Sequence, residues 1–185
     1  WPIGECRADA GRVSPSGASS AGVSDAGRAT PPRLVVGLVV DSLSAELFDR
    51  MEPAYTGGFK TFIRRGIRYR EAHHDHALTQ TAPGHLTLMS GRFPGPAGIP
   101  GNEFFDRTQR RIVYCVEDAD AELLGAAKRG ASYRNVDASA LGDWMKRANL
   151  KSMVFSIAAK DRSAILLGGK RPDGAFWFDP ESGGF

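Results

Sequence analysis

The chain has 185 residues, room for one domain of ordinary size or for a large part of a bigger one. Hydrophobic residues make up 42% of it and charged residues 24%, as in typical globular proteins, and no run of about 18 apolar residues could span a bilayer. The formal net charge is +3, from 24 basic and 21 acidic residues scattered along the sequence, so we expect neither a membrane span nor a nucleic acid partner.

Residues 1–32 are rich in Ser, Gly, Ala and Pro and offer no apolar face to bury. This composition predicts a flexible leader or linker. Because no charged region is followed by an apolar one, we expect any secretory signal to be absent or already removed. The two cysteines, Cys6 and Cys115, are too few for a zinc finger or a disulfide framework, and whether they pair stays open.

The composition changes at Arg33, which marks the start of a domain predicted to cover residues 33–185. Residues 34–40 form a continuous apolar run rich in β-branched side chains, typical of a strand buried on both faces of a parallel sheet. Asp41 follows at the carboxyl end of this strand, where ligand sites lie in open α/β sheets. We therefore expect Asp41 to be a functional carboxylate.

Helical and strand patterns then alternate along the rest of the chain. We expect helices over residues 42–51, 58–66 and 138–148, and strands over residues 67–72, 152–158, 164–167 and 175–178. This alternation predicts an α/β domain with a mostly parallel central sheet and helices on both faces.

The stretch TQTAPGHLTLMSG, residues 79–91, reads as the start of a helix. Pro83 suits the first turn, which puts Thr81 at or just before the N-cap. The free N–H groups and the positive dipole end at that point form a site for a phosphoryl group, and a hydroxyl there can act as a nucleophile. The alternative is that Thr79 or Thr81 simply caps the helix.

A hydroxyl nucleophile needs a base or a metal to activate it. Asp41 is one candidate oxygen ligand, and His73, His74, His76 and His85 are all the histidines of the chain. The first three lie too close together in sequence to point in one direction from a strand or loop, which argues against joint metal ligation. His85, behind the candidate nucleophile, is better explained as a hydrogen-bonded structural residue.

Three polar residues further along the chain could meet an anion. Asn102 follows a Gly/Pro-rich turn and could donate to a phosphoryl oxygen, although asparagine often occupies turns for backbone reasons. Lys160 and Arg162 follow a predicted strand at positions i and i+2, so both could reach one anion from the same side. A surface salt-bridge group is the alternative for these two cations.

Motifs along most of the chain resemble those of the alkaline phosphatase superfamily. In order they are Asp41 after its apolar run, His76-Ala77, Thr81-Ala82-Pro83-Gly84-His85, Gly98-Ile99 with Gly101-Asn102, Tyr114 to Asp118, Arg134-Asn135 and Lys160-Asp161-Arg162. The likeness runs from about residue 32 to residue 185 and is closest to the phosphate-irrepressible monoesterases with a threonine nucleophile.

The resemblance implies a role for each candidate residue. Thr81 would attack phosphorus to give a covalent phosphothreonine and would bind one of two zinc ions, which Asp41 would also ligate. Asn102 would contact a phosphoryl oxygen, while Lys160 and Arg162 would stabilise charge on the non-bridging oxygens. A cationic pair of this kind goes with phosphate monoesters as substrates, because they carry more charge than diesters. A periplasmic or secreted location is also implied.

In this superfamily the other zinc ligands lie well beyond the position of Phe185. A catalytic zinc normally has about three protein ligands, and Asp41 and Thr81 supply only two oxygen atoms. We therefore expect this chain alone to be an inactive fragment with an incomplete fold. One alternative is a phosphodiesterase, nucleotide pyrophosphatase or phosphonate hydrolase of the same superfamily. Another is a truncated, non-catalytic binding module.

Overall fold

The computed structural model describes residues 32–124 and 130–185 of the chain. The predicted leader, with Cys6, lies outside the described residues except for residue 32. The chain divides into two compact units after Leu38, and each is described by itself. In the first unit the described residues 32–38 are extended or bent without forming a strand. The second unit contains all the helices and strands described below.

Two short helices follow Asp41, as the sequence predicted. Helix α1 covers Ala45–Met51 and continues into the 3-10 turn η1, Glu52–Ala54, and helix α2 covers Gly57–Arg65. The hydroxyl of Ser44 caps α1 by accepting the N–H of Leu47 at 3.1 Å. Aromatic rings join the two helices: Phe48 of α1 contacts Phe59 of α2 edge to face, with centroids 6.2 Å apart, and Tyr55 stacks on Phe59 at 5.0 Å.

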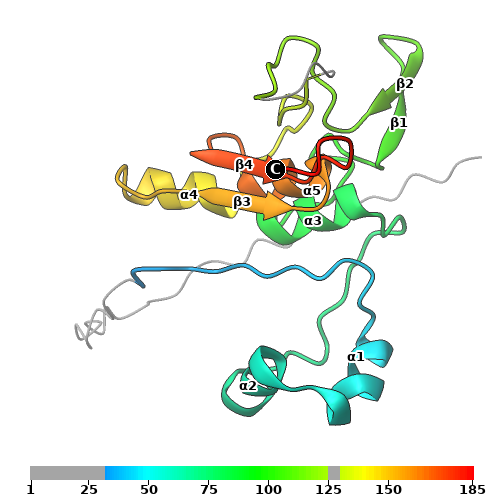
Figure 1. Cartoon of the computed structure of the whole chain (residues 1–185). Coiled ribbons are helices and arrows are strands. Elements are labelled where there is room, and N and C mark those ends of the chain that lie inside the picture. The colour runs from blue at the N-terminus through cyan, green and yellow to red at the C-terminus, as the bar shows by residue number, and fades with distance from the viewer. Residues whose placement is uncertain (1–31, 125–129) are drawn as a thin grey trace, which may run out of the picture. The chain divides into compact units, whose positions relative to one another are not determined.

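The centre of the second unit is a strand–helix–strand crossover. Strand β3, Phe155–Ala158, pairs in parallel with β4, Gly174–Trp177, and helix α5, Asp161–Gly168, connects them and packs on both (Figure 1). Helix α3, Thr81–Ser90, packs against α5, and α4, Leu141–Ala148, leads into β3. The buried core around these elements consists of Ala82, Leu86, Ala97, Ile99, Cys115, Val116, Tyr133, Val136, Ala138, Ile165 and Leu166.

A β-hairpin that the sequence did not reveal lies between α3 and α4. Strand β1, Glu103–Asp106, pairs antiparallel with β2, Arg111–Tyr114, and the register places Glu103 opposite Tyr114 (Figure 1). Asp106 organises the turn by accepting the N–H groups of Thr108 and Gln109. The hairpin begins directly after Asn102, which places that residue at its base.

Three expected strands are wrong. Residues 34–40 and 67–72 form none, and residues 164–167 belong to α5. A strand needs a neighbouring strand for its backbone hydrogen bonds, and the described part of the chain supplies none to the first two segments. Leu34 and Val36 are accordingly 78% and 77% exposed. A four-residue apolar run cannot by itself distinguish a strand from a buried helix, which explains the third error.

The α/β class is confirmed, but the sheet is smaller than expected. Residues 32–124 and 130–185 form one parallel and one antiparallel pair of strands in place of a continuous central sheet. Helix α5 covers one face of β3, where the buried Ser156 hydroxyl donates to the Ala164 carbonyl at 2.6 Å. On the other face Phe155 and Ile157 are 56% and 69% exposed. No helix among the described residues is long and apolar enough to cross a membrane.

Candidate active site

Thr81 is the first residue of α3, with Gln80 at the N-cap and Pro83 in the first turn. Its hydroxyl does not cap the helix. It donates a hydrogen bond to Oδ2 of Asp41, at 3.0 Å. The geometry therefore differs from simple N-capping: this hydroxyl points to a carboxylate beside the positive end of a helix.

Asp41 joins the Thr81 hydroxyl to a cation. The same Oδ2 atom accepts a hydrogen bond from Nζ of Lys160 at 2.9 Å. This ammonium group holds the pKa of the Asp41 carboxyl below its ordinary value, and the Thr81 hydroxyl acts in the same direction. Ser42, with φ 62°, turns the chain directly after Asp41 toward α1. Asp41 is thus an ionised carboxylate fixed against the Thr81 hydroxyl at neutral pH.

Asn102 is tied to the start of α3 through its side chain and its backbone. Its Oδ1 accepts the N–H of Ala82 at 2.9 Å, and its own N–H donates to Oε1 of Gln80 at 2.8 Å. Because Oδ1 serves the helix, Nδ2 is the amide atom that can donate to an oxygen of a bound anion. Both interpretations of Asn102, the backbone role and the donor role, are compatible with this geometry.

Lys160 and Arg162 start helix α5 and do not project from a strand end, because β3 stops at Ala158. Lys160 is the N-cap residue and pairs with Asp41, whereas Arg162 donates from Nη1 to the Tyr114 hydroxyl at 3.0 Å. The two cations therefore have different partners. The Nε atom of Arg162 is buried and has no hydrogen-bond partner within the described chain.

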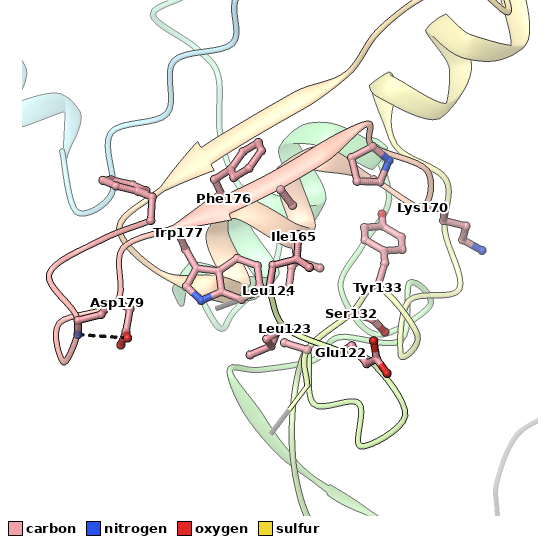
Figure 2. A pocket seen from close by; sticks show the side chains of 16 residues that line it. Glu122, Leu123, Leu124, Ser132, Tyr133, Ile165, Lys170, Phe176, Trp177 and Asp179 are labelled. Atoms are coloured by element: carbon pink, nitrogen blue, oxygen red, sulfur yellow. Dashed lines mark hydrogen bonds between the residues drawn. The ribbon is translucent and has the colours of Figure 1, made fainter. Parts of the chain in front are cut away.

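A cavity of about 400 Å³ lies beside two of these groups, Asn102 and Arg162, whereas Asp41, Thr81 and Lys160 do not line it. Its lining residues are Gln80, Asn102, Glu103, Tyr114 and Arg162. A larger cavity of about 610 Å³ borders α5 and β4, where Tyr133, Ile165 and Trp177 lie around it (Figure 2). Its lining includes none of the five candidate residues, so the smaller, polar cavity next to the start of α3 is the one relevant to the predicted chemistry.

The histidines do not assemble a metal site with Asp41. The rings of His74 and His76 contact each other edge to face, 5.1 Å apart. Burial lowers the pKa of His76, and the neighbouring His74 adds to the effect. His85 is only 6% exposed, and burial lowers its pKa, an effect that a hydrogen bond with the Thr81 backbone partly offsets. His85 is thus a buried residue behind Thr81, as expected.

The described residues fit a zinc site only in part. Asp41 and Thr81 offer two oxygen atoms 3.0 Å apart, which suits a metal that accepts oxygen ligands. In the described ranges no group of three or more His, Cys, Asp or Glu side chains is placed to hold a metal ion. These residues alone do not complete a catalytic site.

Sequence reasoning missed two residues of the site. Gln80 holds the backbone of Asn102, and Tyr114 links Arg162 to Asp161 by donating its hydroxyl proton to Asp161 Oδ1 at 2.5 Å. Tyr114 was part of a recognised motif, but no role was attached to it. Its function depends on partners 47 and 48 residues further along the chain, which local patterns do not reveal.

Sequence comparisons with known proteins match most of the chain. The family model described as type I phosphodiesterase / nucleotide pyrophosphatase matches residues 35–183. Alkaline phosphatase PhoK of Sphingomonas sp is 38% identical over 158 residues, covering 84% of this chain and 28% of PhoK. Alkaline phosphatase PafA of Elizabethkingia meningoseptica is 36% identical over 159 residues, covering 83% of this chain and 29% of PafA.

Solved structures give the same result. A crystal structure of a mutant of alkaline phosphatase PafA aligns with a TM-score of 0.80 at 34% identity, covering 84% of this chain and 31% of that one. Wild-type PafA aligns with a TM-score of 0.71, covering 74% of this chain and 27% of PafA. The chain therefore resembles these alkaline phosphatases in sequence and fold and spans less than a third of their length.

Proposed function

Because the chain belongs to the type I phosphodiesterase / nucleotide pyrophosphatase family, we propose that it carries the nucleophile half of a phosphomonoesterase that works through a covalent phosphothreonine. The observation that carries this proposal is the hydrogen bond from Thr81 to Asp41 at the start of α3. It aims a hydroxyl away from the helix and toward a carboxylate, and Gln80, the residue before Thr81, lines a polar cavity.

In the first step the Thr81 oxygen forms a bond to phosphorus, the bond from phosphorus to the leaving oxygen breaks, and the hydroxyl proton passes through solvent to the released alcohol. In the second step a water oxygen forms a bond to phosphorus, the bond to Thr81 breaks, and phosphate and the free Thr81 hydroxyl are released. Asp41 orients the hydroxyl. Lys160 stabilises the ionised form of this carboxylate and so lowers its pKa, which makes Asp41 a weak base toward the Thr81 hydroxyl. The hydroxyl therefore needs a second source of activation, and zinc, when bound, would supply it by lowering the pKa of the Thr81 hydroxyl.

Charge on the phosphoryl oxygens would be met by the Asn102 amide and the Arg162 guanidinium. Such preorganised donors stabilise a transition state because they need no reorientation when charge develops. Arg162 supports the choice of a monoester, since its positive charge lines the cavity and interacts more strongly with a doubly charged monoester than with a singly charged diester. Lys160 would act through Asp41, whose carboxylate it stabilises as an ion pair.

The two-zinc site implied by the family resemblance needs ligands in addition to Asp41 and Thr81. We propose that they come from parts of the protein outside the described residues and that the 185-residue chain alone does not turn over substrate. The same resemblance leads us to propose a periplasmic or secreted location.

The test is hydrolysis of p-nitrophenyl phosphate and of bis-p-nitrophenyl phosphate by the protein expressed from its complete gene. We expect a higher kcat/KM for the monoester. A clear preference for the diester would support a phosphodiesterase instead, the activity that the family description names. Absence of hydrolysis with either ester, in protein loaded with zinc, would favour a non-catalytic binding module.

A further inference from the structure

Tyr114 closes a chain of hydrogen bonds that ends on Arg162. Its hydroxyl donates to Asp161 Oδ1 at 2.5 Å and accepts from Arg162 Nη1 at 3.0 Å. The Arg162 guanidinium also lies toward the face of the Tyr114 ring, with its Cζ 6.0 Å from the ring centroid. Both residues are partly buried and line the 400 Å³ cavity.

The direction of these bonds is fixed by the single proton of the hydroxyl. The hydroxyl uses that proton to donate to Asp161, so its lone pairs are left to accept from Arg162. Burial raises the pKa of Tyr114, and the bond to Asp161 raises it further, so the hydroxyl keeps its proton at neutral pH. Asp161 is itself held in place, because the backbone N–H of Arg162 donates to Oδ1 at 2.6 Å.

Tyr114 also belongs to the same hairpin base as Asn102. Glu103, which follows Asn102, pairs with Tyr114 across the hairpin, and the N–H of Cys115 donates to the Asn102 carbonyl at 3.0 Å. The base of β1 and β2 therefore connects the two groups proposed to meet phosphoryl oxygens. One of them, Asn102, lies in the hairpin base, and the other, Arg162, is held there through the Tyr114 hydroxyl.

From this geometry we infer that Tyr114 is a positioning residue, which fixes the Arg162 guanidinium relative to the Asn102 amide and thereby favours substrates with a doubly charged phosphoryl group. The inference rests on the proposed phosphomonoesterase function. A free arginine side chain must lose rotamer freedom when it binds an anion, whereas one already held by Tyr114 loses less. The benefit is greatest for the monoester, because its additional negative charge interacts most strongly with the guanidinium.

The experiment is a double-mutant cycle on the protein expressed from its complete gene. Tyr114→Phe removes only the hydroxyl, and Arg162→Ala removes the group it is proposed to position. We expect Tyr114→Phe to lower kcat/KM for p-nitrophenyl phosphate by about tenfold, the factor expected when one hydrogen bond to a charged group is lost. The effect on the diester should be smaller. In the Arg162→Ala background the same change should have almost no further effect.

Tyr133→Phe is the matched control. This tyrosine is 8% exposed, and its hydroxyl has no hydrogen-bond partner within the described chain, so its removal should leave both activities unchanged. If Tyr114→Phe leaves the monoester and diester activities of an active enzyme unchanged, or lowers them equally with and without Arg162, the positioning role is wrong while the proposed function stands. If the wild-type protein hydrolyses neither ester, both the proposed function and the positioning role of Tyr114 are wrong.

Discussion

Asn102 allows catalysis and stability to be separated, because its two side-chain atoms have different tasks. Oδ1 accepts the N–H of Ala82 at the start of α3, whereas Nδ2 is the proposed donor to phosphoryl oxygen. Asn102→Asp keeps an oxygen for the helix and removes the donor. Asn102→Ala removes both.

Both variants should lose activity, but only one should lose stability. Loss of one preorganised donor costs roughly 10²–10³ in kcat, so we expect at least that loss in both variants, and a further loss in Asn102→Asp because its carboxylate repels the phosphoryl group. Asn102→Ala also leaves an N–H at the start of α3 without its partner, which should lower the free energy of unfolding by about 1 kcal/mol. Asn102→Asp should not, since a carboxylate near a helix N-terminus is favourable.

The assay is kcat/KM for p-nitrophenyl phosphate together with urea unfolding, on the protein expressed from its complete gene. Asn149→Asp is the matched control. Its Oδ1 accepts the N–H of Lys151 in a turn after α4, so the same chemical change there should leave activity unaltered. Near-wild-type turnover by a folded Asn102→Asp variant would refute the donor role of Asn102.

Three further predictions concern other residues. Arg162→Ala should reduce monoester hydrolysis more than diester hydrolysis, because the charge that Arg162 meets is greater on the monoester; equal losses, measured as kcat/KM on both esters, would count against the proposed specificity. Burial raises the pKa of the Cys115 thiol to about 12, so alkylation of Cys115 in the folded protein, followed by peptide mapping, should stay slow from about pH 7 to about pH 10. Rapid labelling at about pH 8.5 without unfolding would contradict this burial. Metal analysis should find much less zinc in the 185-residue chain than in the complete gene product, since Asp41 and Thr81 are too few ligands; equal zinc content would show that the missing ligands are within this chain.

Local patterns predicted those parts of the fold that depend on neighbouring residues. The start of α3 was predictable because Pro83 is acceptable only in a first turn, and α1, α2 and α4 follow from helical patterns a few residues long. The segments at 34–40 and 67–72 failed because strand formation depends on a partner, which hydrophobicity does not supply. Helix α5 was misassigned because its apolar part is only four residues long.

The candidate site was predictable to a similar extent. Thr81, Asp41 and Lys160 meet at one carboxylate oxygen, and Asn102 contacts the same helix start, so residues selected from motifs do come together in space. The pairing of Lys160 with Asp41 was not predicted, because it joins residues 119 positions apart. Tyr114 was missed for the same reason, since its hydrogen bonds join it to Asp161 and Arg162, which are 47 and 48 residues away in the sequence.

The nucleophile can be identified most directly by trapping the covalent intermediate. The protein expressed from its complete gene is mixed with a phosphate monoester, quenched rapidly in acid, digested and mapped by mass spectrometry. We predict one phosphorylated site, at Thr81, which disappears in Thr81→Ala and persists in Thr79→Ala with most of the turnover retained. A phosphoryl group on Thr79, or full turnover by Thr81→Ala, would contradict the account.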